Sequence, residues 1–314
     1  MGVLNQIKHS FPISKKVSSL FANYNKTNES DLETIKINQG LILNNFNCKL
    51  KKEEILTDLR KSEFKVFSQW GDDGIINFLV DYLDIKDKRF VEFGVENYTE
   101  CNTKFLLMSQ NWKGLIMDGS NENMSSLRSS DLYWKFDIKA IDVFVTAENI
   151  NELLSDNGFS GEIGILHIDI DGNDYWIWKS VQVANPVIVI VEYNSIFGYN
   201  NPWTVAYNSS FMRSKEHYSY LCYGTSLLSI CDLAGEKGYD FVGCNSNGNN
   251  AYFVRKDYRK GLKNLTASEG YVESHFSESR DLAGRLTFLR GKNRIDLLKG
   301  TNIYNTRTNA VEKI

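Results

Sequence analysis

In this 314-residue sequence, several short apolar runs end in an acidic residue, and each of these acids could take part in chemistry. A carboxylate can accept the hydroxyls of a ribose, neutralise a sulfonium or an amine, or take a proton from a hydroxyl group. The acids are Glu92, Asp118, Asp169, Asp171 and Glu192. If the apolar runs are neighbouring parallel strands, the acids meet at the sheet edge where open α/β sheets bind their ligands.

His167, Asp169 and Asp171 alternate along one apolar run, so a strand there would present all three on one face. Two carboxylates this close repel each other unless a proton or a ligand lies between them. We expect Asp169 to be the general base of a reaction at a hydroxyl group, with His167 as the second candidate and Asp171 in the same catalytic group. The alternative for His167 is a structural histidine of the core.

A divalent metal ion is a second possible use of these acids. Oxygen ligands from Asp169, Asp171 and Glu192 would suit Mg²⁺ or Mn²⁺, and the ion would make an acceptor hydroxyl more acidic. Glu192 would have to reach over from another predicted strand. We therefore favour the metal-free route.

Apolar strands and amphipathic helices alternate from residue 68 onward, which is typical of a parallel, doubly wound α/β sheet. Predicted strands cover 89–95, 114–117, part of 135–145, 164–170, 187–192, 239–244 and 251–255. Predicted helices cover 72–83, 99–111, 121–129, 147–157, 174–181 and 226–237. A polar segment with an Asn-Gly step joins the last two strands and predicts a hairpin. The pattern therefore predicts a seven-stranded Rossmann-like sheet whose final pair is antiparallel.

The turn after the first strand discriminates between nucleotide ligands. A dinucleotide site requires G-x-G-x-x-G at this place, but the sequence has the single glycine Gly94 between Glu92 and Glu96. Two carboxylates would repel a pyrophosphate, whereas S-adenosylmethionine brings a cationic sulfonium and an amino group. We therefore favour S-adenosylmethionine as the cofactor and rank a dehydrogenase third, behind a non-catalytic module that binds a nucleotide-sugar or a partner.

Segment 90–118, preceded by Ser-Gln-Trp-Gly-Asp-Asp at 68–73, resembles the FkbM-type family of S-adenosylmethionine-dependent methyltransferases. Further matching segments lie at 146–150, 167–174, 186–194 and 248–255, so the resemblance covers roughly residues 66 to 256. The sequence departs from the family pattern at Asn97 and Tyr98, where a second glycine is common, and at Cys101, which replaces a serine. The resemblance implies a class I methyltransferase fold. It also implies O-methylation of a sugar or nucleotide-linked sugar in surface glycan (capsule or lipopolysaccharide) biosynthesis.

The strand-end rule and the matched motifs together predict a set of cofactor contacts. These are Gln69, Asp73, Glu92, Gly94, Asn102, Thr103, Asp118 and Ser120. Asp118 is expected to bind the ribose, and Asn102 and Thr103 open a helix whose N–H groups favour a carboxylate. Capping of the following helix is the alternative for all three.

Acceptor contacts are predicted at the next strand end and in the loop that follows it. Glu192 and Asn194 share the pocket of Asp169, and the loop 195–223 carries Trp203 and Tyr207 among other aromatic residues. Aromatic rings beside polar groups suit a carbohydrate, although packing explains them equally well.

The composition excludes several classes of protein. Lys and Arg number 36 against 39 Asp and Glu, so nucleic acid is not expected as a partner. The five cysteines show no C-x-x-C pair, which argues against a disulfide scaffold and a structural zinc site. No run is long enough for a membrane helix, and residues 1–10 lack the apolar core of an export signal. We therefore expect a cytoplasmic protein with a small-molecule or glycan acceptor, either monomeric or homo-oligomeric.

Three parts are expected along the chain. Residues 1–62 would form a helical N-terminal extension with a helix at 49–59, residues 63–260 the methyltransferase domain, and residues 261–314 a C-terminal helical tail.

Overall fold

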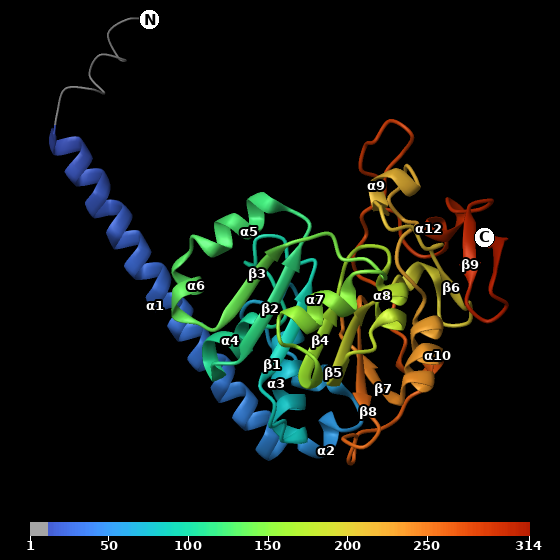
Figure 1. Ribbon diagram of the computed structural model, residues 1–314, viewed down its shortest axis with the longest axis horizontal. Coiled ribbons are helices and arrows are strands. Elements are labelled where there is room, and N and C mark those ends of the chain that lie inside the picture. Colours follow the sequence, from blue (N-terminus) through green and yellow to red (C-terminus); the bar gives the residue numbers. More distant parts are fainter. Residues whose placement is uncertain (1–11) are drawn as a thin grey trace, which may run out of the picture.

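A mixed seven-stranded sheet forms the centre of the computed structural model, which describes the backbone of residues 12–314 and side chains from Ser30 onward (Figure 1). The strand order is β3-β2-β1-β4-β5-β8-β7. The strands are β1 (Arg89–Phe93), β2 (Lys113–Asp118), β3 (Ile138–Asp142), β4 (Gly161–Ile168), β5 (Ala184–Glu192), β7 (Tyr239–Cys244) and β8 (Asn250–Arg255). The first five strands run parallel, whereas β8 lies antiparallel between β5 and β7. The predicted Rossmann-like sheet with a final antiparallel pair is confirmed.

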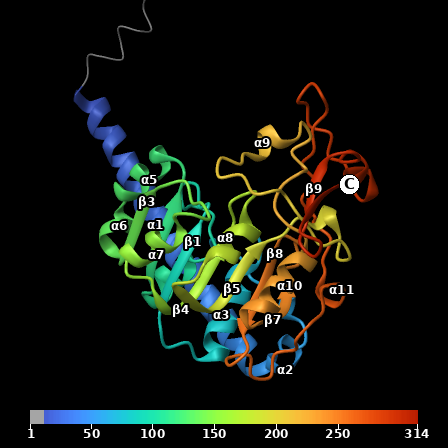
Figure 2. The same cartoon turned by 45° about the vertical axis from the view of Figure 1, so that its right-hand side comes forward.

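Helices cover both faces of this sheet (Figure 2). One layer contains α3 (Asp72–Leu83), α4 (Lys104–Gln110) and α5 (Asn121–Arg128), with the short α6 (Asp131–Lys135) after it. The other layer contains α7 (Ile150–Asp156), α8 (Asp174–Ser180) and α10 (Leu227–Lys237). The predicted helices are therefore present, but α4 begins later than expected, at Lys104.

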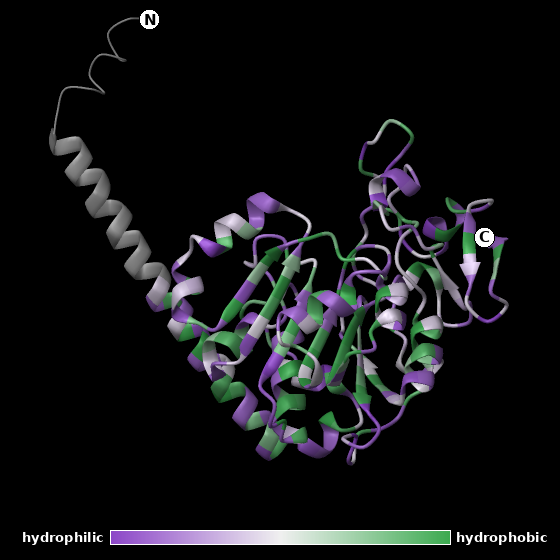
Figure 3. Ribbon diagram, viewed as in Figure 1, coloured by the Kyte–Doolittle hydropathy of each residue, from purple (hydrophilic) through white to green (hydrophobic). Residues whose placement is uncertain are grey.

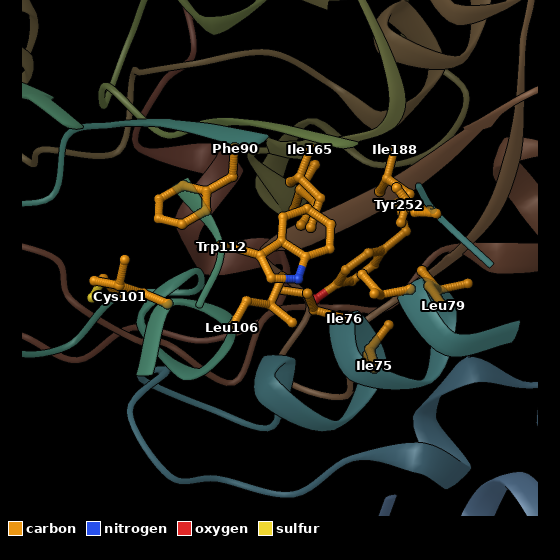
Figure 4. Close-up of a cluster of buried hydrophobic side chains, with 14 of the residues drawn as sticks. Ile75, Ile76, Leu79, Phe90, Cys101, Leu106, Trp112, Ile165, Ile188 and Tyr252 are labelled. Atoms are coloured by element: carbon orange, nitrogen blue, oxygen red, sulfur yellow. The ribbon is translucent and has the colours of Figure 1, made fainter. Parts of the chain in front are cut away.

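Two apolar cores lie between the sheet and its helices. The strands are the most continuously hydrophobic elements of the described structure (Figure 3). In the core on the α3 side, Trp112 and Phe90 are fully buried beside Ile165, Ile188 and side chains of α3 and α4 (Figure 4). Strands buried on both faces need apolar residues at successive positions, as in Val187 to Val191. This packing fixes the strand ends, where the polar groups lie.

The N-terminal region differs from the predicted arm. A single helix, α1 (Pro12–Leu50), is followed by α2 (Lys52–Ile55) and a 3₁₀ turn (Leu59–Ser62), in place of one helix at 49–59. The end of α1 packs on the domain: Gly40 lies against Phe105 of α4, and the side-chain amide of Asn44 donates to Asp81 of α3 at 2.6 Å. The prediction about an export signal concerns residues 1–10, which lie outside the described residues.

The C-terminal region also differs from the predicted helical tail. It contains only two short helices, α11 (Ala267–Gly270) and α12 (Lys292–Asp296), and a hairpin of β9 (Asn302–Asn305) and β10 (Ala310–Lys313). The hairpin extends β6 (Trp203–Thr204) into a second, three-stranded sheet. Within the described part of the chain, no helix is both long and apolar enough to cross a membrane.

Candidate active site

Polar side chains form a row across the carboxyl edge of the parallel strands. Ile168 of β4 pairs with Val191 of β5, so Asp169, one residue further on, lies beside Glu192. Glu192 in turn pairs with Asn250 of β8. Neighbouring strands lie about 4.8 Å apart, so one small ligand can reach all three side chains. The strand-end acids of β4 and β5 are thus brought together as predicted.

Two adjoining cavities open at this edge. The first, which we call the β2 cavity, has a volume of about 210 Å³ and is lined by Met117, Asp118, Gly119, Phe144 and Val145. The second, the β5 cavity, has a volume of about 290 Å³ and is lined by Trp70, Glu192, Arg213, Tyr223, Asn250 and Phe276 among others. Gly94, Glu96, Asp169 and Asp171 line both cavities. Asp169 therefore stands at the junction of two compartments.

Asp118 organises the β2 cavity. Its carboxylate accepts hydrogen bonds from the backbone N–H groups of Glu96 at 2.9 Å and Ser120 at 2.8 Å. These bonds fix the loop after β1 to the end of β2. Because each carboxylate oxygen can accept a second hydrogen bond, Asp118 can still bind the two hydroxyls of a ribose, with apolar walls beside it for a base.

Gly94 lets two strand ends approach closely. Its φ is +67°, and a Cβ atom at this position would lie 1.7 Å from the carbonyl oxygen of Asp169. Glu96 and Tyr98 also have positive φ, at 48° and 60°, so the loop turns sharply after β1. The single glycine of this turn is therefore required by contact with β4 as well as by its backbone conformation.

Glu92 is used within the protein. It is buried, and its oxygens accept bonds from the backbone N–H groups of Asn102 at 2.8 Å and Thr103 at 3.2 Å and from the Thr103 hydroxyl. It also lies 2.9 Å from Nδ1 of His167. With four partners Glu92 has no acceptor capacity left for a ligand, and the N–H groups of Asn102 and Thr103 are occupied. These three positions shape the cavity wall instead of donating to a cofactor carboxylate.

His167 and Glu92 form a buried hydrogen-bonded pair. Burial lowers the pKa of His167, but the carboxylates of Glu92 and Asp169 raise it by more, so the net shift is upward. Burial likewise raises the pKa of Glu92, and its bonds to His167 and Thr103 bring it below the usual value. Nε2 of His167 lies 3.2 Å from the side-chain amide of Asn102. Both ring nitrogens are engaged, so His167 is not available as the base.

Asp169 and Glu192 face the β5 cavity, and neither carboxyl has a hydrogen-bond partner among the described residues. Burial, with Asp171 and Asp174 nearby, raises the pKa of Asp169 to about 7. Burial and the charge of Asp169 raise the pKa of Glu192 well above its usual value. Two unpaired carboxyls this close repel each other when both are ionised. The pair therefore keeps one proton at a pH at which a carboxyl in water has already lost it. Asp169 is thus poised to exchange a proton near neutral pH.

Asp171, the third predicted catalytic acid, is drawn away from this pair. Its backbone has φ +56°, and its carboxylate accepts a bond from Arg213 at 3.0 Å. Arg213 also lies 3.6 Å from Glu278 and stacks on Tyr223, 3.9 Å from the ring centre. Arg213 therefore ties the loop after β4 to the C-terminal region and closes one side of the β5 cavity.

Asp72, and not the predicted Asp73, lies at the cavity edge. Asp73 is buried away from both cavities, where Oδ2 accepts backbone N–H groups of residues 66–68, and burial raises its pKa to about 6. Asp72 lines the β5 cavity instead and accepts bonds from Asn245, Asn250 and Tyr252. Gln69, a predicted cofactor contact, lines the same cavity.

Four other predicted residues lie away from both cavities in the described structure. Ser120 caps α5 through Asn123. Asn194 is buried and donates to the carbonyls of Leu221 and Tyr223. The indole of Trp203 donates to Glu312, and the Tyr207 hydroxyl bonds to Glu148. The packing alternative therefore accounts for these aromatic rings, because they hold the second sheet and the loop together.

The sequence analysis missed the residues that close the β5 cavity: Asp72, Arg213, Tyr223, Asn247, Asn250 and Phe276. Asn250 had a usable signal, because an antiparallel last strand must begin at the edge where its parallel neighbour ends. Phe276 had none, since the tail reaches the site only through tertiary packing.

The described residues offer no set of side-chain ligands for the divalent metal ion considered above. Among the described residues, no group of three or more His, Cys, Asp or Glu side chains is placed to hold a metal ion. Of the three predicted ligands, Asp171 is turned toward Arg213.

No family model and no curated protein matches this sequence. Similar solved structures include the N-terminal domain of EvdMO1 with SAH bound (11% identity, TM-score 0.39, 65% of this chain and 94% of that chain). They also include the O-methyltransferase from Bacillus cereus in complex with SAH (12%, 0.39, 70% and 91%) and the plantazolicin methyltransferase BamL with a triazolic desmethylPZN analog and SAH (14%, 0.37, 86% and 90%). With TM-scores below 0.5, the fold assignment rests on the strand order and register described above.

Proposed function

We propose that this protein is an S-adenosylmethionine-dependent O-methyltransferase and that its acceptor is a sugar hydroxyl. One observation carries the proposal. Across the sheet edge, an acid at the end of β2, a tight glycine turn after β1, an unpaired acid after β4 and a second unpaired acid on β5 follow one another. This order separates a donor compartment from an acceptor compartment, with Asp169 at their junction.

The β2 cavity fits the nucleoside part of the methyl donor. Asp118 offers acceptor oxygens for ribose hydroxyls, and Met117, Phe144 and Val145 offer apolar walls for adenine. Carboxylates line the adjoining region, which suits a cationic sulfonium and disfavours a pyrophosphate. When bound, S-adenosylmethionine supplies a methyl group on a positively charged sulfur, which is a good leaving group.

The protein's own task is then to hold the acceptor oxygen in line with that methyl group and remove its proton. Asp169 is placed to do so, because it faces both cavities and has no internal partner. With the methyl donor bound, Asp169 would take the hydroxyl proton of the acceptor, whose oxygen would receive the methyl group while the carbon–sulfur electron pair remained on sulfur. The role in surface glycan synthesis belongs to this proposal and rests on the family resemblance alone.

Calorimetry with S-adenosylhomocysteine tests the proposal. The wild type should bind it and should not bind NAD. Asp118→Ala should weaken binding by about 10- to 150-fold, the equivalent of about 1.5–3 kcal/mol for a bond to a charged group. Asp142→Ala is the matched control, because Asp142 pairs with Asp118 on the next strand but is bound to Arg128 and Asn121. Tight NAD binding, or equal losses in both variants, would refute the proposal.

A further inference from the structure

We propose that the acceptor is an amino sugar and that its protonated amine binds Glu192 and the side-chain carbonyl of Asn250 in the β5 cavity. This inference rests on the proposed function and names the chemical class of its acceptor.

Buried acceptor atoms without donors mark the subsite. Oε2 of Glu192 and the side-chain carbonyl oxygens of Asn247 and Asn250 are buried and have no hydrogen-bond partner in the described structure. Asn247 is 5% exposed and Asn250 3%, and both line the β5 cavity. Leaving a buried acceptor unpaired is costly, so a ligand that supplies donors here gains affinity. An ammonium group has three donors and no acceptor.

The orientation of the two amides is fixed by their other bonds. The Asn250 amide nitrogen donates to Asp72 at 3.0 Å, and the Asn247 amide nitrogen donates to Asn249 at 3.0 Å. Turning the Asn250 amide over would place its oxygen against a carboxylate. The Asn250 atom without a partner is therefore the side-chain carbonyl oxygen, which is an acceptor. Asn250 is paired with Glu192 in the strand register.

The charges that line the β5 cavity favour a cation. Glu92 is paired with His167 and Asp171 with Arg213, which uses both cationic side chains that line the cavity. Asp72, Asp169 and Glu192 form no ion pair with any described residue. A phosphate in this space would meet a surplus of negative charge, so a nucleotide-linked sugar is disfavoured and an amine is attracted.

The amine of S-adenosylmethionine is not the group that fits here. The donor compartment is lined by the segments after β1, β2, β3 and β4, and neither Glu192 of β5 nor Asn250 of β8 lines it. Glu192 lies one strand beyond β4, and Asn250 on β8 is one strand further from the ribose acid Asp118 on β2. The aromatic residues Tyr223 and Phe276 line the same end of the cavity and suit the ring of a sugar.

Titration calorimetry on protein saturated with S-adenosylhomocysteine tests the inference, with D-glucosamine, D-glucose and N-acetyl-D-glucosamine as probes. At pH 7, D-glucosamine should bind at least tenfold more tightly than the other two sugars. Glu192→Gln should abolish this preference and leave S-adenosylhomocysteine binding within twofold of the wild type. Glu100→Gln, at the exposed rim of the same cavity and paired with Lys65, is the matched control and should keep the preference.

Repeating the titration in buffers of different ionisation enthalpy adds an independent readout. Because Glu192 and Asp169 share a proton when no ligand is bound, D-glucosamine should release a proton on binding and D-glucose should not. Equal binding of the sugars, no binding of any of them, or a preference that survives Glu192→Gln would overturn the inference. Loss of S-adenosylhomocysteine binding in Glu192→Gln would assign Glu192 to the binding site of the methyl donor and would also overturn the inference. If the wild type failed to bind S-adenosylhomocysteine at all, the proposed function would fall first, so the two failures are distinguishable.

Discussion

Asp169 and Glu192 differ from the other acids of the site because their carboxyls have no internal hydrogen-bond partner. Glu92 is held by His167, Asp118 by two backbone N–H groups and Asp171 by Arg213. An unpaired, mostly buried carboxyl with a pKa of about 7 changes charge in the pH range where proteins work. The protonation of Asp169 can therefore be followed by measuring activity as a function of pH.

Asp169→Asn should keep the shape of the site and remove the base. The turnover should fall by roughly 10²- to 10⁴-fold, while the affinity for S-adenosylhomocysteine changes little. In the wild type, kcat/KM should rise as the pH passes about 7, because only the deprotonated carboxyl accepts a proton. Steady-state kinetics from pH 5.5 to 8.5 measures both effects.

Asp171→Asn is the control for this experiment, because it removes an acid two residues away that is already paired with Arg213. It should lose less than tenfold in turnover and keep the rise near pH 7. Near-wild-type turnover in Asp169→Asn would return this residue to a structural role.

The same substitution should also change stability in a pH-dependent way. Burial raises the pKa of Asp169 to about 7 from 3.8, so the folded protein binds this proton more tightly than the unfolded chain does. The stabilising effect of that proton is complete below pH 4 and is lost as the pH rises through 7. Asp169→Asn should therefore be more stable than the wild type by about 1–3 kcal/mol at pH 8 and show no gain at pH 4. Urea unfolding at the two pH values measures the difference; an equal gain at both would contradict the linkage.

At the scale of elements, the site depends on how closely β1 and β4 approach at their carboxyl ends. The Gly94 turn lies against the backbone of Asp169, so the position of Asp169 and the shape of the loop after β1 are coupled. A change at Gly94 should disturb both.

Gly94→Ala should abolish S-adenosylhomocysteine binding and lower the melting temperature, because the new methyl group would meet the Asp169 carbonyl. Gly158→Ala is the matched control: Gly158 also has positive φ, at 81°, but no heavy atom lies within 4 Å of its added Cβ. It should cost only about 1 kcal/mol of backbone strain and leave binding intact. Calorimetry and thermal melts compare the two, and equal losses of binding would show that the contact with β4 is unimportant.

Sequence patterns predicted the strands well because a strand buried on both faces must be apolar throughout, as 187–191 is. They also located Asp118, Asp169 and Glu192, which need only the rule of strand ends. They were wrong on the start of α4, since residues 99–103 form a loop that wraps the buried Glu92 instead of a helical turn. They missed α1, whose inner face carries Asn44 and Asn47, so it lacks a clear apolar stripe.

For the whole molecule, the C-terminal region forms one wall of the β5 cavity. Ser274 and Phe276 line the β5 cavity, and Glu278 faces Arg213. Tyr193 and Ser195, just after β5, bind this segment through Val272 and Ser274. The tail thus contributes to the site, although it lies outside residues 66–256, which carry the sequence motifs described above.

Phe276→Ala should raise the KM of the acceptor about 5- to 30-fold and leave S-adenosylhomocysteine affinity unchanged, because it removes about 1–2 kcal/mol of ring contact on the acceptor side only. Phe288→Ala, in the same region but 59% exposed and outside the cavity, should behave as the wild type. Equal effects of the two variants on the acceptor KM would argue against this wall.

The place of β8 in the sheet has a consequence for biosynthesis. β8 is the last strand of the main sheet to leave the ribosome, yet it is inserted between β5 and β7 and supplies Asn250. The roughly 60 residues that separate Glu192 from Asn250 take about 3–12 s to translate. During that interval the apolar edge of β5 lacks its final neighbour and is open to pairing with another nascent chain. A chain that stopped after Phe211 but before Asn247 would have the residues of the β2 cavity, would lack Asn247, Asn249 and Asn250 of the β5 cavity, and would expose an unpaired edge of β5.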